Sequence, residues 1–338
     1  MGKGEHDAIE AGHTTINLAG GCFPAENRGL GDAVAHAVFS LHPMHVLFPE
    51  PLLERSAMPA GVRISFRSNT TRVSGSIVSQ NESGMLDLCC DGEIVASLDL
   101  TQKDNFTFEG LSDAEKLIEL WLPQFGSFQL RSLEIDDGAT LRPFADARPR
   151  WVTYGSSITQ CRTAASPTQT WPAIVARQHG LNLTCLGYGG QCHLDAMVAR
   201  MIRDMPADYI SMCLGINIQG ASSLGPRAFR PAIIGAVQIV REKHPDIPLV
   251  LMSPICSPPR EETPNAVGFH LKGMRKEVQA AAEALQSHGD RHVHYVDGLS
   301  VFGTDYEHLL PDALHPDAEG YRVMGKNFKA EVAEKFFV

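Results

Sequence analysis

Two short segments far apart in the chain hold residue types that could perform chemistry together. Gly155-Ser156-Ser157-Ile158-Thr159 lies mid-chain, and Asp312-Ala313-Leu314-His315 lies near the C-terminus. A serine hydroxyl attacks a carbonyl only when a base removes its proton, and a carboxylate next to the base orients it and stabilises its charge. The pattern therefore predicts a serine hydrolase or acyltransferase in which Ser157 is the nucleophile, His315 the base and Asp312 its orienting carboxylate.

Each of these residues taken alone also fits a structural role. A Ser-Ser pair after a strand commonly forms a turn or caps a helix, and an Asp commonly caps a turn. The prediction depends on their combination with donors for the oxyanion of the tetrahedral intermediate. Three donors are plausible: the backbone N–H of Ser157, the backbone N–H of Gly190 and the side-chain amide of Asn217.

Two polar residues, Gln191 and His193, follow Gly190 closely. They are candidates for binding polar groups of a substrate, although such residues often only satisfy loop backbone. The loop 257–268, which is rich in Pro and Glu, could overhang the same site.

The order of these motifs resembles the conserved blocks of the SGNH (GDSL-type) serine hydrolase superfamily. Segment 155–159 is similar to its first block, Gly189-Gly190 to its second, Gly215-Ile216-Asn217-Ile218 to its third and segment 312–315 to its fifth. The resemblance implies a flavodoxin-like sheet, the triad and oxyanion donors just named, and no metal or other cofactor. Ser156 and Ile218 depart from the family, which usually has Asp at both positions.

The second half of the chain has the elements that such a site needs. Apolar runs alternate with amphipathic stretches, which predicts a doubly wound α/β domain at 149–338 with five parallel strands covered on both faces. Small and polar residues follow four of the strands, so the site is expected at the carboxyl edge of the sheet. The expected strands are 151–154, 183–186, 209–214, 249–253 and 293–296, and the expected helices are 171–179, 194–203, 229–244, 271–287 and 318–336. Ser157 is expected in a turn, with a long loop before the next helix.

The first half, residues 1–148, is expected to be an antiparallel, jelly-roll-like β-sandwich. Short runs rich in β-branched and aromatic residues recur about every ten residues, and Cys90-Asp91-Gly92-Glu93 reads as a hairpin turn. A similar sandwich precedes the catalytic domain in a subset of bacterial SGNH enzymes, including one implicated in polyketide acyl transfer. Residues 32–41 could form a short helix. The expected strands are 62–66, 72–78, 85–89, 94–100, 105–108, 117–122 and 128–135.

Composition limits the partners that we expect. The 338 residues carry a net charge of −10, which argues against a nucleic-acid surface, and no apolar run is long enough to span a membrane. The N-terminus shows no secretory signal, and the eight cysteines form no CxxC pair, so a reducing, cytoplasmic location is expected. The partner is then a small-molecule ester, and self-association through the sandwich into a homo-oligomer stays open.

A few other features of the sequence suggest different functions. His42 and His45, or His292 and His294, suggest a metal site, but no third ligand with recognisable spacing accompanies either pair. The glycines after the strands lack the fingerprints of dinucleotide or phosphate binding. A non-catalytic carbohydrate-binding protein is a further reading, which the complete set of site residues opposes.

The residues do not decide between hydrolysis and acyl transfer, because both reactions use the same acyl-enzyme. Hydrolysis is the more frequent activity in the family. We expect a serine esterase acting on a short acyl group on a polar alcohol, such as an acetylated sugar.

Overall fold

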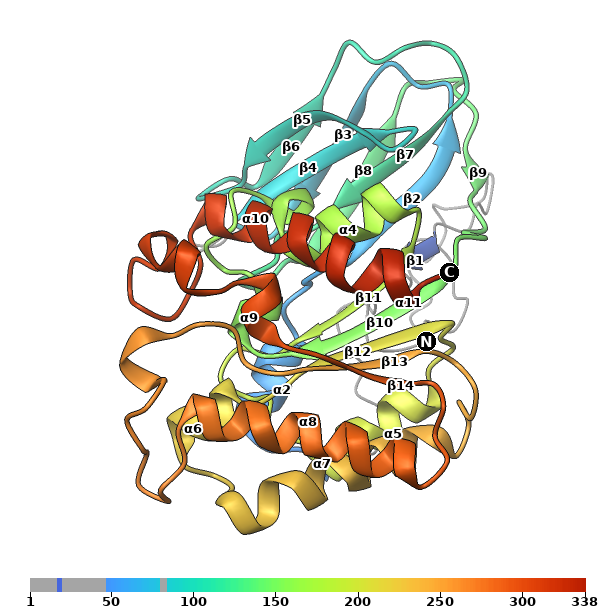
Figure 1. Ribbon diagram of the computed structural model, residues 1–338. Helices are drawn as coiled ribbons and strands as arrows, with labels where there is room; N and C mark the ends of the chain where they lie inside the picture. Colours follow the sequence, from blue (N-terminus) through green and yellow to red (C-terminus); the bar gives the residue numbers. More distant parts are fainter. Residues whose placement is uncertain (1–16, 20–46, 80–83) are drawn as a thin grey trace, which may run out of the picture.

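Two kinds of β-sheet make up the computed structural model, which describes residues 17–19, 47–79 and 84–338. The second half of the chain forms a five-stranded parallel sheet in the order β11-β10-β12-β13-β14 (Figure 1). Every neighbouring pair in it is parallel, as the predicted doubly wound α/β fold requires. The strands are β10 (Arg150–Gly155), β11 (Asn182–Gly187), β12 (Tyr209–Cys213), β13 (Leu249–Met252) and β14 (Val293–Val296).

Helices cover both faces of this sheet. One face packs on α4 (Trp171–His179) and α10 (Ala318–Phe328), and the other packs on α5 (Ala196–Asp204), α7 (Pro226–Arg241) and α8 (Leu271–Ser287) (Figure 1). The predicted bounds of α4 and α8 are confirmed to the residue. The last helix, expected as one piece over 318–336, is interrupted by a π-helical turn at Lys329–Ala333 before α11 (Glu334–Phe336).

Antiparallel strands of the first half form a sandwich of two sheets. One sheet has the order β1-β2-β7-β4-β5, with β9 beside β2, and the other has the order β6-β3-β8. Their inward side chains form one apolar core that includes Phe66, Val73 and Phe106. The strands are β1 (Asn17–Ala19), β2 (Arg63–Ser68), β3 (Val73–Ile77), β4 (Met85–Cys90), β5 (Glu93–Asp99), β6 (Asn105–Phe108), β7 (Lys116–Trp121), β8 (Leu130–Ile135) and β9 (Arg142–Pro143).

The predicted hairpin between β4 and β5 is confirmed. Its two turn residues, Asp91 and Gly92, have φ of 48° and 87°, the left-handed backbone that a two-residue turn between twisted strands requires. The seven expected sandwich strands all appear, with bounds within two residues. The expected helix at 32–41 lies outside the described residues, and the division at residue 148 stays a prediction.

The sandwich and the α/β sheet meet along a seam of buried charge. Arg63 of β2, fully buried, donates to Asp146, to the side chain of Asn182 and to the carbonyl of Leu183. Glu119 of β7 lies 3.3 Å from Arg63 and 2.8 Å from Arg148. The Arg63 guanidinium also covers the Trp121 ring at 5.0 Å. The two halves therefore share a polar interface as well as apolar contacts.

Several short helices that were not predicted from the sequence lie between these elements. They are α2 (Glu50–Ser56), α3 (Ser157–Gln160), α6 (Ile216–Ala221), α9 (Gly298–Val301) and the 3₁₀ turns Pro167–Gln169, Pro258–Arg260 and Thr304–Leu309. In the described part of the chain, no helix has both the length and the apolar character needed to cross a bilayer.

Candidate active site

Ser157 stands at the carboxyl end of β10, where it is the first residue of α3. This corrects the expectation of a long loop after Ser157, because the helix begins at Ser157 itself. Ser156, which occupies the position of the family's usual Asp, caps α3 by accepting a hydrogen bond from the N–H of Ile158 at 3.2 Å. A serine in that place therefore keeps the capping interaction that an Asp would supply.

Ser157, His315 and Asp312 form one hydrogen-bonded chain. The Ser157 Oγ lies 2.8 Å from the Nε2 of His315, and the Nδ1 of His315 lies 2.6 Å from the Oδ2 of Asp312. A carboxylate accepts, so Nδ1 carries the proton and Nε2 is left to accept from the serine hydroxyl. This tautomer is the one in which His315 can remove the proton of Ser157.

Asp312 also accepts backbone hydrogen bonds that fix its own loop. Its Oδ1 receives the N–H of Leu314 at 3.0 Å and that of His315 at 2.7 Å. Partial burial raises the pKa of Asp312, but the bonds from the His315 side chain and backbone, together with the His315 charge, outweigh burial and hold the pKa below its usual value. Asp312 is thus a carboxylate at neutral pH.

Side chains from other loops brace this segment, and the sequence did not reveal them. Ala313 has a φ of 60°, and its carbonyl accepts the Ser257 hydroxyl at 2.7 Å. Arg260 donates to the Ser257 Oγ at 2.9 Å, and the Thr163 hydroxyl donates to the carbonyl of Pro316 at 2.7 Å. The loop that presents His315 is therefore tied both to the segment after β13 and to the segment after α3.

Asn217, in the first turn of α6, is oriented by its own carbonyl. Its Oδ1 accepts the N–H of Cys192 at 3.0 Å, which directs the amide nitrogen the other way. Gly190 has a φ of +74°, a backbone that side chains disfavour, so the turn after β11 needs glycine to hold its N–H in this orientation. Within the described residues, the N–H groups of Ser157 and Gly190 and the Asn217 amide donate to no protein acceptor.

Gln160 links the loop after β11, which contains Gly189 and Gly190, to the sandwich. Its Oε1 accepts the N–H of Gly189 at 3.1 Å, while its Nε2 lies 3.4 Å from the carbonyl of Gln124, in the loop after β7. The Gln124 side chain in turn lies within hydrogen-bond distance of the carbonyls of Cys161 and Ala164. No pattern in the sequence predicts these contacts, which join residues between 29 and 40 positions apart.

Comparisons with known proteins assign each half of the chain to a family. The sequence profile of the GDSL-like lipase/acylhydrolase family matches residues 149–332. This chain belongs to the GDSL-like lipase/acylhydrolase family. Residues 29–131 match the profile described as the SsfX3 N-terminal domain. The expected membership of the SGNH superfamily and the expected two-part fold are thereby confirmed.

Solved structures extend the likeness to nearly the whole of this GDSL-like chain. The salicylyl-acyltransferase SsfX3 from a tetracycline biosynthetic pathway is 32% identical, with a TM-score of 0.83 over 95% of this chain and 94% of its own. A protein of Bacteroides ovatus named as a GDSL-like lipase is 21% identical, with a TM-score of 0.77 over 94% and 95%. A family two carbohydrate esterase from Clostridium thermocellum is 16% identical, with a TM-score of 0.63 over 82% and 93%. The last two show the fold alone. No curated protein sequence shows a significant match.

Two residues predicted to bind substrate, Gln191 and His193, follow Gly190 in the loop after β11. The His193 Nε2 lies 3.0 Å from the carbonyl of Gly190, so Nε2 donates, and Nδ1 lies 2.8 Å from the Ser223 hydroxyl. Both ring nitrogens of His193 are therefore already used in bracing the loop. Gln191 is partly exposed and forms no side-chain hydrogen bond within the part of the chain that the structure describes.

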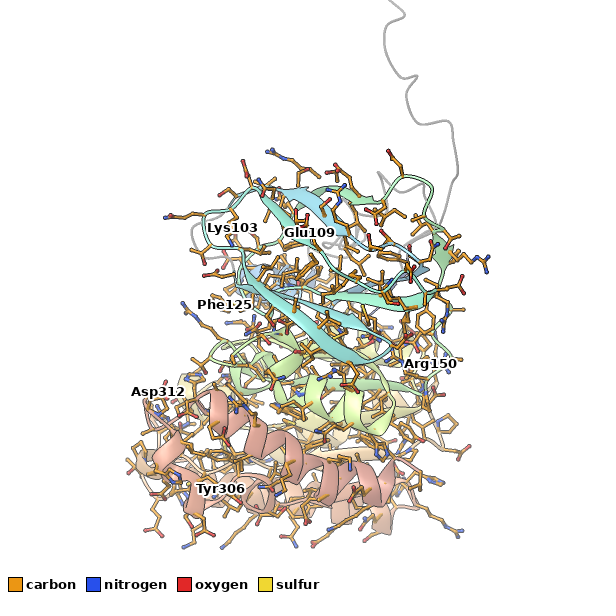
Figure 2. The ribbon with its side chains drawn as sticks, turned by 90° about the horizontal axis from the view of Figure 1, so that it is seen from above. Lys103, Glu109, Phe125, Arg150, Tyr306 and Asp312 are labelled. Carbon is orange, nitrogen blue, oxygen red and sulfur yellow. The ribbon has the colours of Figure 1, made fainter. Side chains whose placement is uncertain are left out.

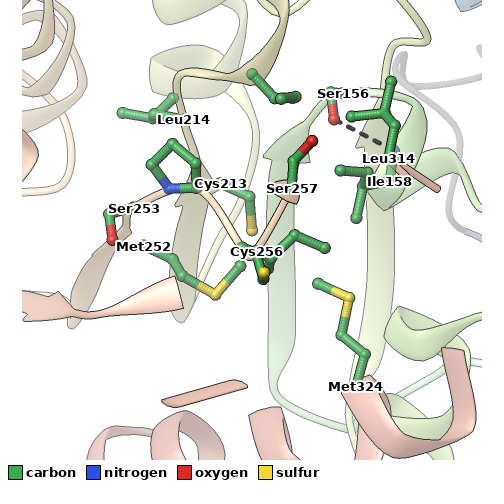
Figure 3. Close-up of a pocket in the computed structure, with 13 residues that line it drawn as sticks. Ser156, Ile158, Cys213, Leu214, Met252, Ser253, Cys256, Ser257, Leu314 and Met324 are labelled. Atoms are coloured by element: carbon green, nitrogen blue, oxygen red, sulfur yellow. Dashed lines mark hydrogen bonds between the residues drawn. The ribbon is translucent and has the colours of Figure 1, made fainter. Parts of the chain in front are cut away.

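A small, mainly apolar pocket lies next to the triad on the β12 and β13 side. It has a volume of about 20 Å³ and adjoins Ser156 and Leu314, the chain neighbours of the nucleophile and of the base (Figure 3). Such a volume holds little more than one water-sized group. Its lining consists of Ser156, Ile158, Cys213, Leu214, Ile216, Met252, Ser253, Pro254, Ile255, Cys256, Ser257, Leu314 and Met324.

The alternative metal site receives no support from the described residues. No three His, Cys, Asp or Glu side chains among residues 17–19, 47–79 and 84–338 are grouped so that they could hold a metal ion. His294 instead stacks on the ring of Phe336 at 4.3 Å, and burial lowers its pKa. His42 and His45 lie outside the described residues.

Proposed function

We propose that this GDSL-like protein is a serine esterase that cleaves a carboxylic ester through an acyl-enzyme on Ser157. The observation that carries the proposal is the hydrogen-bonded chain Asp312–His315–Ser157, in the tautomer that makes His315 a base. The neighbouring unengaged donors of Ser157, Gly190 and Asn217 complete the requirements of acyl transfer.

The reaction uses each of these groups in turn. The Ser157 Oγ attacks the ester carbonyl carbon as its proton passes to the Nε2 of His315, and the carbonyl oxygen becomes an oxyanion held by the three donors. Collapse breaks the bond to the alcohol oxygen, which takes the proton from His315 and leaves. Water then attacks the acyl-enzyme and gives a proton to His315. As the bond to the Ser157 Oγ breaks, His315 returns that proton to Oγ, and a carboxylic acid leaves.

The acyl group that we propose is short, on a polar alcohol such as a sugar. The pocket of about 20 Å³ beside Ser156 supports this, because a volume of that size accommodates a group as small as methyl. The fold shared with family two carbohydrate esterases is compatible with an acetylated sugar. We retain the expectation of a cytoplasmic location, since the described cysteines are free thiols.

Acyl transfer is the second candidate. It is favoured by the 32% identity with SsfX3, a salicylyl-acyltransferase, over 95% of this chain. The same acyl-enzyme then passes its acyl group to the hydroxyl of an acceptor, with His315 taking the acceptor's proton. The difference from hydrolysis lies in the nucleophile of the second step.

Steady-state hydrolysis of p-nitrophenyl acetate, longer p-nitrophenyl esters and acetylated sugars tests the proposal. We expect wild type to prefer acetate and Ser157→Ala to lose about 10⁴-fold or more in kcat. Partition of the acetyl group between water and an added alcohol separates hydrolysis from transfer. Undiminished turnover by Ser157→Ala would refute the role of Ser157.

A further inference from the structure

Two arginines from separate segments stack on one phenylalanine beside the proposed active site. The guanidinium carbon of Arg162 lies 4.2 Å from the centre of the Phe125 ring, and that of Arg55 lies 5.6 Å from it. Arg55 belongs to α2, Phe125 to the loop after β7 of the sandwich, and Arg162 to the loop after α3. Stacking on an aromatic face holds a guanidinium in place while its N–H groups stay free at the edge.

This trio lies next to the nucleophile. A Cβ placed on Gly189 would be 3.6 Å from the Cβ of Ser157 and 3.8 Å from the Cδ of Arg55, so both Ser157 and the Arg55 stem lie against Gly189. Arg162 adjoins Thr163, whose hydroxyl binds the carbonyl of the residue after His315. Phe125 and Asp312 lie on the same side of the molecule, and Arg150 on the other (Figure 2).

The charges of Arg55 and Arg162 are available for a ligand. Neither has a carboxylate partner within residues 17–19, 47–79 and 84–338, whereas other surface arginines such as Arg150 and Arg230 form ion pairs with Asp208 and Glu277. Arg162 is exposed and Arg55 is partly exposed. The chain as a whole carries a net charge of −10, so its long-range field repels anions. A local pair of guanidiniums is what would hold an anionic group near Ser157 in spite of that field.

The position of the trio indicates which part of a substrate it would meet. The small apolar pocket lies on the β12 and β13 side of Ser157, whereas Gly189 and Arg55 lie on the β11 side, and β10 stands between β11 and β12 in the sheet. With the acyl group in the pocket, the alcohol leaves toward His315, whose loop is tied to the segment that carries Arg162. The alcohol therefore lies nearer to the arginines than the acyl group does.

We propose that Arg55, Phe125 and Arg162 form a binding subsite for an anionic group, a carboxylate or a phosphate, on the alcohol part of the ester. The planar guanidinium matches either anion with paired N–H donors, and Phe125 offers an apolar face to the adjoining part of the alcohol. This inference rests on the esterase proposed above and specifies the class of its substrate.

Three matched acetate esters test the subsite: 4-acetoxybenzoate, 4-acetoxyphenyl phosphate and the neutral 4-acetoxybenzamide. The ratio of kcat/KM for each anion to kcat/KM for the amide is measured in wild type, Arg55→Gln, Arg162→Gln and the double variant. Arg291→Gln is the control, because it removes the same charge from an exposed residue in the turn before β14, at the opposite edge of the sheet. We expect the ratio to fall about tenfold in the double variant, less in each single variant and not at all in Arg291→Gln.

Comparison of the two anions shows whether carboxylate or phosphate is preferred, and added salt should weaken either preference. The subsite would be overturned if the ratio of kcat/KM, anion to amide, were the same in the double variant as in Arg291→Gln. It would also be overturned if kcat/KM fell equally for the anions and for the neutral amide. Should the double variant fail to fold, as judged by circular dichroism, Arg162→Gln decides alone, since Arg162 is exposed.

Binding separates the failure of the subsite from the failure of the esterase. Ser157→Ala, with and without the two arginine changes, is titrated with 4-acetoxybenzoate and observed by ligand NMR. Binding that weakens about tenfold when the arginines are removed supports the subsite even where no ester is turned over. Binding that does not weaken overturns the subsite, whatever the activity of Ser157.

Discussion

The carboxyl edge of the parallel sheet and the seam between sheet and sandwich both hold hydrogen-bonded charges, but they differ in burial. At the edge, the side chains of Asp312 and His315 are 54% and 30% exposed. At the seam, Arg63 and Glu119 are 0% and 1% exposed. The edge keeps its polar groups open to a substrate, while the seam removes them from water.

This difference in burial means that the edge and the seam should respond differently to mutation. Breaking an exposed pair costs the fold little, since water replaces the lost partner. Breaking a buried pair leaves a charge without compensation, which is strongly destabilising. We therefore expect changes at the edge to act on rate and changes at the seam to act on the free energy of unfolding.

Of the changes to Asp312 and Asn217 at the edge, Asp312→Asn should produce the largest loss of activity. An amide in place of the carboxylate no longer requires the proton of His315 to be on Nδ1, and it cannot stabilise the imidazolium. We expect kcat for p-nitrophenyl acetate to fall by about 10⁴-fold. The free energy of unfolding in urea should change by about 0.5 kcal/mol or less. If Asp312→Asn lost free energy of unfolding in proportion to its loss of kcat, the edge would not differ from the seam.

Much of this fold could be predicted because its pattern is local. The strands of the sandwich alternate or run apolar between turn residues, and α4 and α8 have an apolar face that ends at their caps. The short helices α3 and α6 were not predicted, since four to six residues show no period. The π-helical turn after Phe328 was missed for a similar reason, because the amphipathic pattern continues through it.

The candidate site divides in the same way. Ser157, Gly190 and Asn217 were predicted because each follows a strand in a short motif. Asp312 and His315 were predicted because they lie three residues apart in a segment that resembles a block of the family. Other side chains near the site form their contacts only after folding, between segments distant in sequence. They are Gln160, Ser257, Arg260 and the trio of Arg55, Phe125 and Arg162. Arg63 likewise sits in a strand that reads as an ordinary half-buried one. A single sequence contains no sign of which side chains will meet across a seam.

Arg63→Met tests the seam directly. The change leaves Glu119 and Asp146 with Arg148 as their remaining cation, and it removes the bonds to Asn182 and Leu183. We expect the free energy of unfolding in urea to fall by about 3 to 5 kcal/mol.

The matched control for the seam is Arg150→Gln. It breaks an ion pair with Asp208 whose side chains are 47% and 40% exposed, and it should cost about 1 kcal/mol or less. Equal losses in the two variants would show that burial does not distinguish the seam. At temperatures where Arg63→Met is folded, its kcat should stay within about threefold of wild type, because Arg63 does not touch the triad.

Asn217 offers the finest test, since its side chain braces a loop through Oδ1 and is proposed to donate to the oxyanion through its amide nitrogen. Asn217→Ala should lower kcat by about 10²- to 10³-fold through the loss of an oxyanion donor. Asn217→Asp keeps an oxygen to accept the N–H of Cys192, so it preserves the brace while removing the donor. If Asn217 acts by donating to the oxyanion, Asn217→Ala and Asn217→Asp should lose similar activity. Asn217→Asp could lose more, because its negative charge repels the oxyanion. If Asp retains wild-type activity, Asn217 acts only by holding the loop, and the edge would then resemble the seam in being structural.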